Sequence, residues 1–260
     1  MAAKLPLILL PPSEGKAPRG DGPRWLAGSM EIDLDAQRRA VMRALATGMK
    51  DKEAARARLL GVKGRALQAA TAANLAVAKA PTMPAIERYT GVLYDALDHR
   101  SLSAAHRRRL DASVVIFTGL WGAVAPADPI PDYKLKMGAA LQPMGKLSTW
   151  WREPLSARVA ELAAGRAVWN LLPNEHAAAW DPPAGLQQWS VRFLQRRGGQ
   201  LKTVSHDNKS LKGALVRFLL DNPGADPSAL AGWKHPAGYR YDRKLTERLG
   251  SFTLLSLVKR

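Results

Sequence analysis

The chain has 260 residues, of which 47% are hydrophobic and 23% charged, so it can bury a sizeable core as an ordinary globular protein does. It contains no cysteine, which excludes disulfides, thiolate nucleophiles, cysteine-bound metals and any sensing of oxidants through a thiol. The formal net charge of +17 is spread over both halves and favours a polyanionic partner, with nucleic acid ahead of an anionic membrane surface.

The hydrophobic pattern predicts strands mixed with helices. The first apolar run ends at Pro11, too early for a signal-peptide core or a membrane span, so we expect a cytoplasmic protein without membrane contact. The expected elements in chain order are a strand at 5–10, helices at 33–47 and 53–79, a strand at 113–118, a helix at 150–164, strands at 167–171 and 201–205, a helix at 209–221 and a strand at 252–258.

These elements predict an α+β (mixed α/β) fold. We expect one domain over residues 1–260, with a central mixed sheet, surrounding helices and a helix-hairpin-helix-like element at about 53–79. The order is not a clean βαβ series and therefore predicts neither a Rossmann fold nor a barrel.

Residues 58–70 are typical of two helices joined by a glycine turn. In a helix-hairpin-helix the turn amides and the positive end of the second helix contact a DNA phosphate without reading the base sequence. Gly61, Lys63, Gly64 and Arg65 are the candidate DNA-binding residues. The turn is one residue longer than the usual pattern, and an ordinary turn between two amphipathic helices is the alternative.

A second candidate region follows the predicted strand at 113–118. The loop beyond it is rich in Gly and Pro, which hold polar groups in fixed positions at the end of a central strand. Asp128, Asp132, Tyr133 and Lys134 would supply the chemistry there, unless the segment is only a proline-rich connection.

Cations at two further places suggest anion capture. Lys209 and Lys212 are three residues apart at the start of a predicted helix, where the helix dipole disfavours positive charge unless an anion binds. Lys16 follows the first strand in a loop that is not a Walker A motif.

Catalytic and metal signals are weaker. The five histidines show no ligand spacing, no Gly-x-Ser-x-Gly motif is present, and we predict neither a metal nor a cofactor. Most tryptophans have apolar neighbours typical of the core, with Trp150 as the exception.

Several of these segments together resemble the YaaA peroxide-stress protein family, over nearly the whole chain. Residues 118–122 (Thr-Gly-Leu-Trp-Gly) and 129–138 (Pro-Ile-Pro-Asp-Tyr-Lys-Leu-Lys-Met-Gly) carry its core signature, and 7–16 (Leu-Ile-Leu-Leu-Pro-Pro-Ser-Glu-Gly-Lys) its opening strand and lysine loop. Further matches are residues 89–94 (Tyr-Thr-Gly-Val-Leu-Tyr), the pair Trp150 and Trp151, and residues 169–171 followed by Glu175. Towards the far end the matches are Lys209 and Lys212, which lead into residues 214–218, and the pairs Gly232 with Trp233 and Gly238 with Tyr239. The chain departs from the family in its lysine loop and in Trp121, where Tyr is more usual.

The resemblance implies sequence-independent binding of double-stranded DNA, a role in resistance to hydrogen peroxide and a lowering of free iron. It also implies one cleft that collects Lys16, Tyr94, Thr118, Tyr133, Lys134, Asn170, Glu175, Lys209, Lys212 and Arg217. The alternative is an enzyme that acts on a nucleotide or another phosphorylated small molecule in this cleft, with Glu175 as general base beside Lys16 and Tyr133. A basic structural protein without a specific ligand is the third reading, and the sequence does not predict the oligomeric state.

Overall fold

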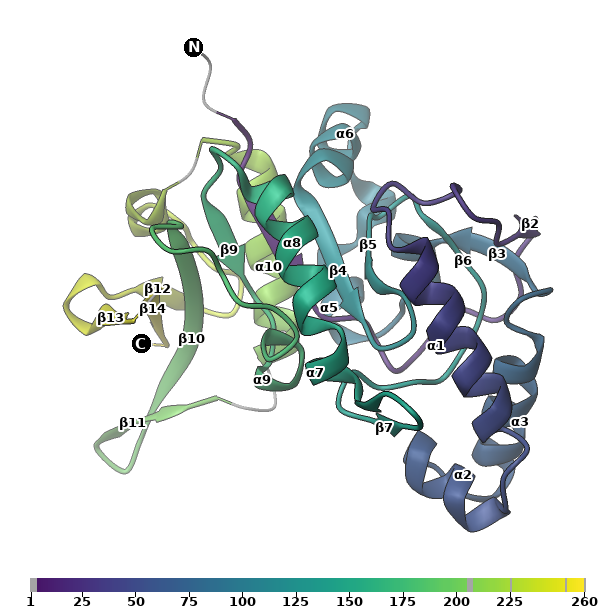
Figure 1. Ribbon diagram of the computed structural model, residues 1–260. Helices are drawn as coiled ribbons and strands as arrows, with labels where there is room; N and C mark the ends of the chain where they lie inside the picture. Colours follow the sequence, from purple (N-terminus) through teal and green to yellow (C-terminus); the bar gives the residue numbers. More distant parts are fainter. Residues whose placement is uncertain (1–3, 205–207, 225, 251, 260) are drawn as a thin grey trace.

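A nine-stranded mixed sheet forms the centre of the computed structural model, which describes residues 4–204, 208–224, 226–250 and 252–259. Its path is β12-β14-β10-β9-β1-β4-β5, while β11 pairs with β10 and β13 with β14 (Figure 1). The bounds are β1 Leu7–Leu10, β4 Val114–Thr118, β5 Gly122–Val124, β9 Val168–Asn170, β10 Gln188–Arg197, β11 Gln200–Thr203, β12 Tyr239–Tyr241, β13 Glu247–Leu249 and β14 Phe252–Lys259.

Five adjacent strands of this sheet, β14, β10, β9, β1 and β4, run parallel to one another. The interior strand β1, between β9 and β4, consists of four apolar residues, and all are buried, as expected for a parallel strand covered on both faces. Two small sheets lie beside the main one: β2 Gly22–Arg24, β3 Pro81–Pro84 and β6 Pro129–Ile130 in the first, β7 Ala140–Leu141 and β8 Gly145–Lys146 in the second.

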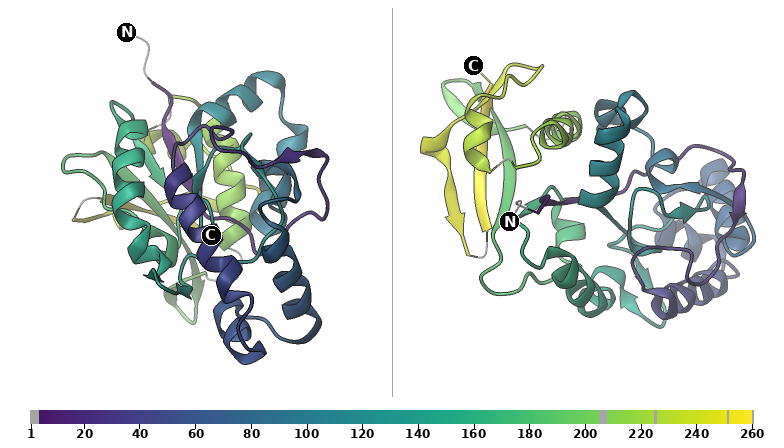
Figure 2. Two further views of the ribbon diagram at one scale, coloured as in Figure 1. Left: turned by 45° about the vertical axis from the view of Figure 1, so that its right-hand side comes forward. Right: turned by 90° about the horizontal axis from the view of Figure 1, so that it is seen from above.

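Helices cover both faces of the central strands, with α8 on one side and α5, α6 and α10 on the other (Figures 1 and 2). The α-helices are α1 Asp35–Gly48, α2 Glu53–Leu60, α3 Gly64–Ala76, α4 Ala85–Arg88, α5 Val92–Leu97, α6 Ala104–Ser113, α7 Leu147–Trp150, α8 Arg152–Ala163, α9 Asn174–Ala177 and α10 Asn208–Asp221. Short 3₁₀ turns span His99–Ser101, Pro227–Ala231 and Arg243–Leu245. None of the helices in the described ranges is long and apolar enough to cross a membrane.

Helices α5 and α10 pack very closely because Gly213 faces α5. A Cβ at this position would lie 2.3 Å from the carbonyl oxygen of Leu93 and 2.8 Å from the Cβ of Ala96. This contact fixes the start of α10 beside α5, and both of these helix starts border the candidate site described below.

The predicted mixed α/β fold with a central mixed sheet and surrounding helices is confirmed. The expected elements at 5–10, 33–47, 113–118, 150–164, 209–221 and 252–258 correspond to β1, α1, β4, α8, α10 and β14. The strand expected at 201–205 is β11, which ends at Thr203; residue 205 lies outside the described ranges. The sequence analysis did not identify β10, although Trp189, Val191 and Phe193 alternate in it at the strand period.

Candidate functional site

The candidate site lies beyond the carboxyl ends of β1, β4 and β9. From β1 the chain proceeds to β4 on one side, whereas β9 pairs with β1 on the other side and leads outward to β10. Loops that leave adjacent parallel strands in opposite directions open a crevice at the sheet edge, and ligands of open α/β sheets bind in such crevices.

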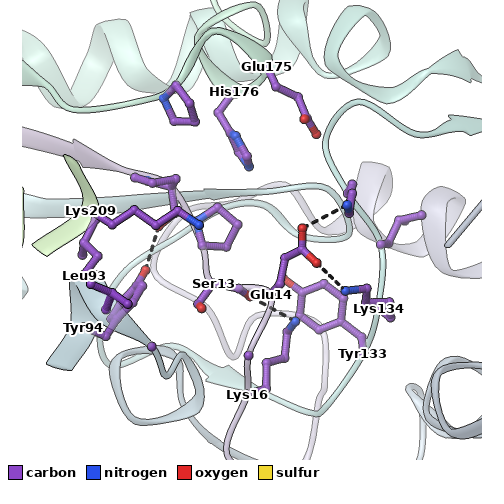
Figure 3. A pocket seen from close by; sticks show the side chains of 18 residues that line it. Ser13, Glu14, Lys16, Leu93, Tyr94, Tyr133, Lys134, Glu175, His176 and Lys209 are labelled. Carbon is purple, nitrogen blue, oxygen red and sulfur yellow. Dashed lines mark hydrogen bonds and ion pairs between the residues drawn. The ribbon is translucent and has the colours of Figure 1, made fainter. Parts of the chain in front are cut away.

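A pocket of about 400 Å³ occupies this crevice (Figure 3), within the volume range typical of small-molecule sites. We call it the cationic pocket. Its wall is formed by residues 11–16 after β1, 91–94 at the start of α5, 133–136, and Pro173, Glu175, His176 and Lys209.

Lys16 lies on one side of the pocket, against aromatic rings. Its Nζ donates to the carbonyl oxygen of Ser13 at 3.3 Å and lies 4.4 Å from the ring centre of Tyr133 and 5.8 Å from that of Tyr89. Burial lowers the pKa of the Lys16 ammonium to about 8, against partial compensation by the charge of Asp132. Lys16 is therefore a poorly solvated amine beside an aromatic surface.

Three hydroxyl groups form a chain behind Lys16. The Tyr133 hydroxyl is 2.6 Å from Thr118 Oγ1 and 2.7 Å from the Tyr89 hydroxyl. Burial raises the pKa of Tyr133 to about 12, so this phenol stays protonated at neutral pH. The chain fixes the Tyr133 ring against which the Lys16 amine lies.

Glu14 contributes a negative charge to the pocket, opposite in sign to that of the lysines. Its carboxylate lies 2.8 Å from Lys134 Nζ and 2.9 Å from Lys136 Nζ (Figure 3). The hydrogen bonds from these two ammonium groups lower the pKa of Glu14 to about 2. Glu14 thus pairs with two lysines that would otherwise be available to an anion.

Glu175 and His176 line the pocket from α9, away from Lys16 (Figure 3). Glu175 Oε1 accepts from the amide of Gly138 at 2.6 Å, and a Cβ at residue 138 would collide with the Glu175 carboxyl group. Burial lowers the pKa of His176 to about 4, so its imidazole is neutral at pH 7.

The structure brings only part of the predicted cleft set to the pocket wall. The residues that line it are Lys16, Tyr94, Tyr133, Lys134, Glu175 and Lys209. Thr118 is fully buried behind Tyr133. Asp128 of the proline-rich loop is also buried, where its carboxylate accepts from the amides of Glu31 and Ala125, each at 2.8 Å.

Three other predicted cleft residues make internal contacts instead. Lys212 Nζ donates to the carbonyl oxygen of Leu171 at 2.8 Å, and burial lowers its pKa to about 8. Asn170 bonds Gln188 and the amide of Leu172. Arg217 donates to the carbonyl oxygens of residues 97 and 98, where α5 ends.

In the region near residues 53–79, where a helix-hairpin-helix-like element is expected, the chain forms α2 and α3 joined by a short turn, which we call the α2–α3 hairpin. Gly61 caps α2 in the left-handed region at φ 66°, and Gly64 begins α3 at φ 55°. Both angles favour glycine. Lys63 and Arg65 are exposed at the turn, and no side chain caps the amino end of α3 within the described residues.

Two contacts join the α2–α3 hairpin to the cationic pocket. A Cβ at Gly61 would lie 3.7 Å from Nζ of Lys136, so this lysine spans the space between the turn and Glu14. The buried Asn74 of α3 donates to the carbonyl oxygen of Lys134 at 2.9 Å and accepts from its amide at 2.8 Å. The hairpin and the pocket wall are therefore neighbours in the structure.

Sequence reasoning missed Asn74 and Lys136 as site residues. Lys134 and Lys136 are two positions apart in an extended segment, a spacing that places both side chains on one face and could have indicated Lys136. Asn74 gave no such signal, because its role depends on a backbone segment distant in sequence. Among the described residues no cluster of His, Asp and Glu could hold a metal ion.

Comparison with known proteins gives a consistent result. A family model described as peroxide stress protein YaaA matches residues 7–245. A UPF0246 protein of Streptomyces coelicolor is 38% identical over 247 residues, covering 94% of this chain and 95% of its own. UPF0246 proteins of Corynebacterium efficiens and Corynebacterium glutamicum are 33% and 32% identical, covering 84% and 82% of this chain and 86% and 84% of their own.

Proposed function

The chain belongs to the peroxide stress protein YaaA family, and from this premise we propose that it is a DNA-binding protein of the response to hydrogen peroxide. It binds double-stranded DNA largely without regard to sequence, through the α2–α3 hairpin and the cationic pocket. Its stress role includes a lowering of free iron. A chain without cysteine does not act in this response by thiol oxidation.

The observation that carries the proposal is the position of the hairpin beside the pocket. Lys63 and Arg65 are exposed at the turn, Lys136 lies beside Gly61, and Lys134 lies on the pocket wall. A DNA backbone presents phosphates at regular intervals, so Lys63 and Arg65 neutralise phosphates directly, and Lys134 and Lys136 do so where a phosphate displaces Glu14. Such contacts position DNA without reading its bases.

The test is duplex binding measured by fluorescence anisotropy over a series of salt concentrations. The logarithm of the association constant falls as the logarithm of the salt concentration rises, and each neutralised phosphate makes this slope steeper by about 0.9. The slope of Lys63→Ala/Arg65→Ala should therefore be shallower than that of the wild type by about 1.8. Lys16→Ala/Lys209→Ala tests the pocket in the same way.

The matched control is Arg197→Ala/Lys202→Ala, which removes the same charge from the β10–β11 ribbon. Both of these residues are exposed, and the ribbon lies at the end of the molecule opposite α2 (Figure 1). The control should lose little affinity. Equal losses in all three double variants would reduce DNA binding to an effect of net charge, and absence of wild-type binding at moderate salt would refute the proposal.

The second candidate function is catalysis on a nucleotide or another phosphorylated small molecule. The volume of the pocket favours it, since about 400 Å³ lies within the range of small-molecule sites. Glu175 would serve as general base opposite Lys16 and Tyr133. Thermal unfolding with a panel of nucleotides should then show a rise in melting temperature that Lys16→Ala abolishes, while duplex affinity is unaffected by the ligand.

A further inference from the structure

Lys16 is the one side chain of the cationic pocket whose surroundings suit a nucleophile better than a counter-ion for phosphate. Its Nζ forms no ion pair within the described residues, whereas Lys134 and Lys136 both pair with Glu14. Its neighbours are the Ser13 carbonyl oxygen and the Tyr133 ring. An ammonium group held only by a carbonyl and a ring loses much of its solvation, which favours the neutral amine.

The charges around Lys16 leave this preference in place. Asp132 and Glu14 favour the ammonium form, whereas Lys134 and Arg88 oppose it. With its pKa lowered to about 8, a much larger share of the Lys16 side chains is neutral at pH 7 than at the ordinary value of 10.5. Desolvated lysines of this kind form Schiff bases with carbonyl substrates.

The pocket around the amine matches a sugar that carries phosphates. Lys209 supplies a cation on its wall, Lys134 and Lys136 supply two more that are paired with Glu14, and the protonated Tyr94 and Tyr133 supply ring surface. The side chains of Lys16, Glu14 and Lys209 all border the same space (Figure 3). Asn74 of α3 holds the backbone of Lys134 on the pocket wall, so the hairpin lies beside this space and a nucleotide displaced from a duplex bound at the turn has a pocket next to it.

We propose that Lys16 forms a covalent imine with the aldehyde of an abasic deoxyribose in DNA. This inference rests on the proposed DNA-binding function and adds a substrate class to the same site. An abasic nucleotide has no base to unstack or unpair, so it leaves the helix at the least cost. Abasic sugars are also a chemical consequence of oxidative damage to DNA, which suits a protein of a peroxide-stress family.

The reaction balances without a further reactant. The lone pair of the neutral Lys16 amine adds to C1′ of the ring-opened sugar, and the carbonyl oxygen takes up a proton to give a carbinolamine. A second proton, taken from solvent, lets this oxygen leave as water, and the nitrogen lone pair forms the C=N bond of the protonated imine. Hydrolysis reverses both steps, and hydride from an added reductant converts the imine into a stable secondary amine.

The experiment is reductive trapping. The full-length protein is incubated with a labelled duplex containing a single abasic site, sodium cyanoborohydride is added, and the covalent adduct is measured on a denaturing gel. An intact duplex and free 2-deoxyribose 5-phosphate are treated in parallel. Digestion and mass spectrometry then locate the modified lysine, so the assignment does not depend on a variant that has to fold.

We expect an adduct with the abasic duplex on Lys16, reduced at least tenfold in Lys16→Arg, which keeps the charge. Lys4→Arg is the matched control, because Lys4 is exposed near the amino end of β1, at the opposite edge of the sheet. The Lys4→Arg variant should form as much adduct as the wild type.

An adduct on another lysine, trapping of the free sugar phosphate alone, or no adduct would each overturn the inference. If intact duplex still binds in the absence of an adduct, the inference fails and the proposed function stands. If neither duplex binds, both fail.

Discussion

Replacement of Asn74 tests whether the α2–α3 hairpin is fixed to the site by the two hydrogen bonds to Lys134. Asn74→Ala removes the partner of both the amide and the carbonyl of residue 134 and leaves a small void. An unpaired buried polar group costs about 1–3 kcal/mol, so the loss of unfolding free energy should be about 3 kcal/mol. For a protein of this size that corresponds to a fall in melting temperature of roughly 6–12 °C.

Urea and thermal unfolding measure this loss directly. Gln68→Ala is the matched control, since Gln68 lies exposed on the same helix and alanine favours helix, and it should change stability by less than about 0.5 kcal/mol. Asn74→Leu keeps most of the volume but cannot form the bonds, so it should lose nearly as much stability as Asn74→Ala.

Hydrogen exchange adds a local measurement. The amide of Lys134 should exchange faster in Asn74→Ala, because its acceptor is gone. A stability loss below about 1 kcal/mol in Asn74→Ala, or full stability in Asn74→Leu, would refute the assignment of hairpin docking to these two bonds.

Three further changes have definite expected outcomes. Gly213→Ala should lower the melting temperature by several degrees in a thermal scan, because its Cβ would overlap the Leu93 carbonyl of α5; an unchanged value would contradict the close packing. Glu14→Gln should tighten duplex binding several-fold at moderate salt by freeing two paired lysines, and weaker binding would count against phosphate contacts there. The pKa of His176 is about 4 in the folded protein and 6.5 in the unfolded chain, so between these pH values the folded protein binds fewer protons than the unfolded chain. The free energy of unfolding should therefore fall by up to roughly 3 kcal/mol as the pH drops from 6.5 to 4. Urea titrations of His176→Gln should show a flatter profile over that range, and a profile parallel to the wild type would assign the acid sensitivity to other groups.

The sequence predicted those parts of the fold and site that depend on local pattern. The apolar run at residues 7–10, the glycine turn at 61–64 and the rigid loop that ends near Lys134 all lie where expected. The remaining features depend on contacts between distant segments, which local pattern does not encode. Lys212 is a turn away from Lys209 on the same helix, yet it is drawn inward by the Leu171 carbonyl, and nothing in the sequence near Lys212 reveals that acceptor.

The position of β1 between β9 and β4, inside the parallel part of the sheet, has a consequence for how the chain folds. Leu10 pairs with Ile116 on one side and Leu9 with Asn170 on the other, so β1 receives its second partner only after the long segment up to Asn170 has been synthesised. Contacts between such distant residues slow folding, and an apolar strand without its partners is prone to aggregate. Nascent chains should therefore depend on protection of Leu7–Leu10 until β9 has emerged.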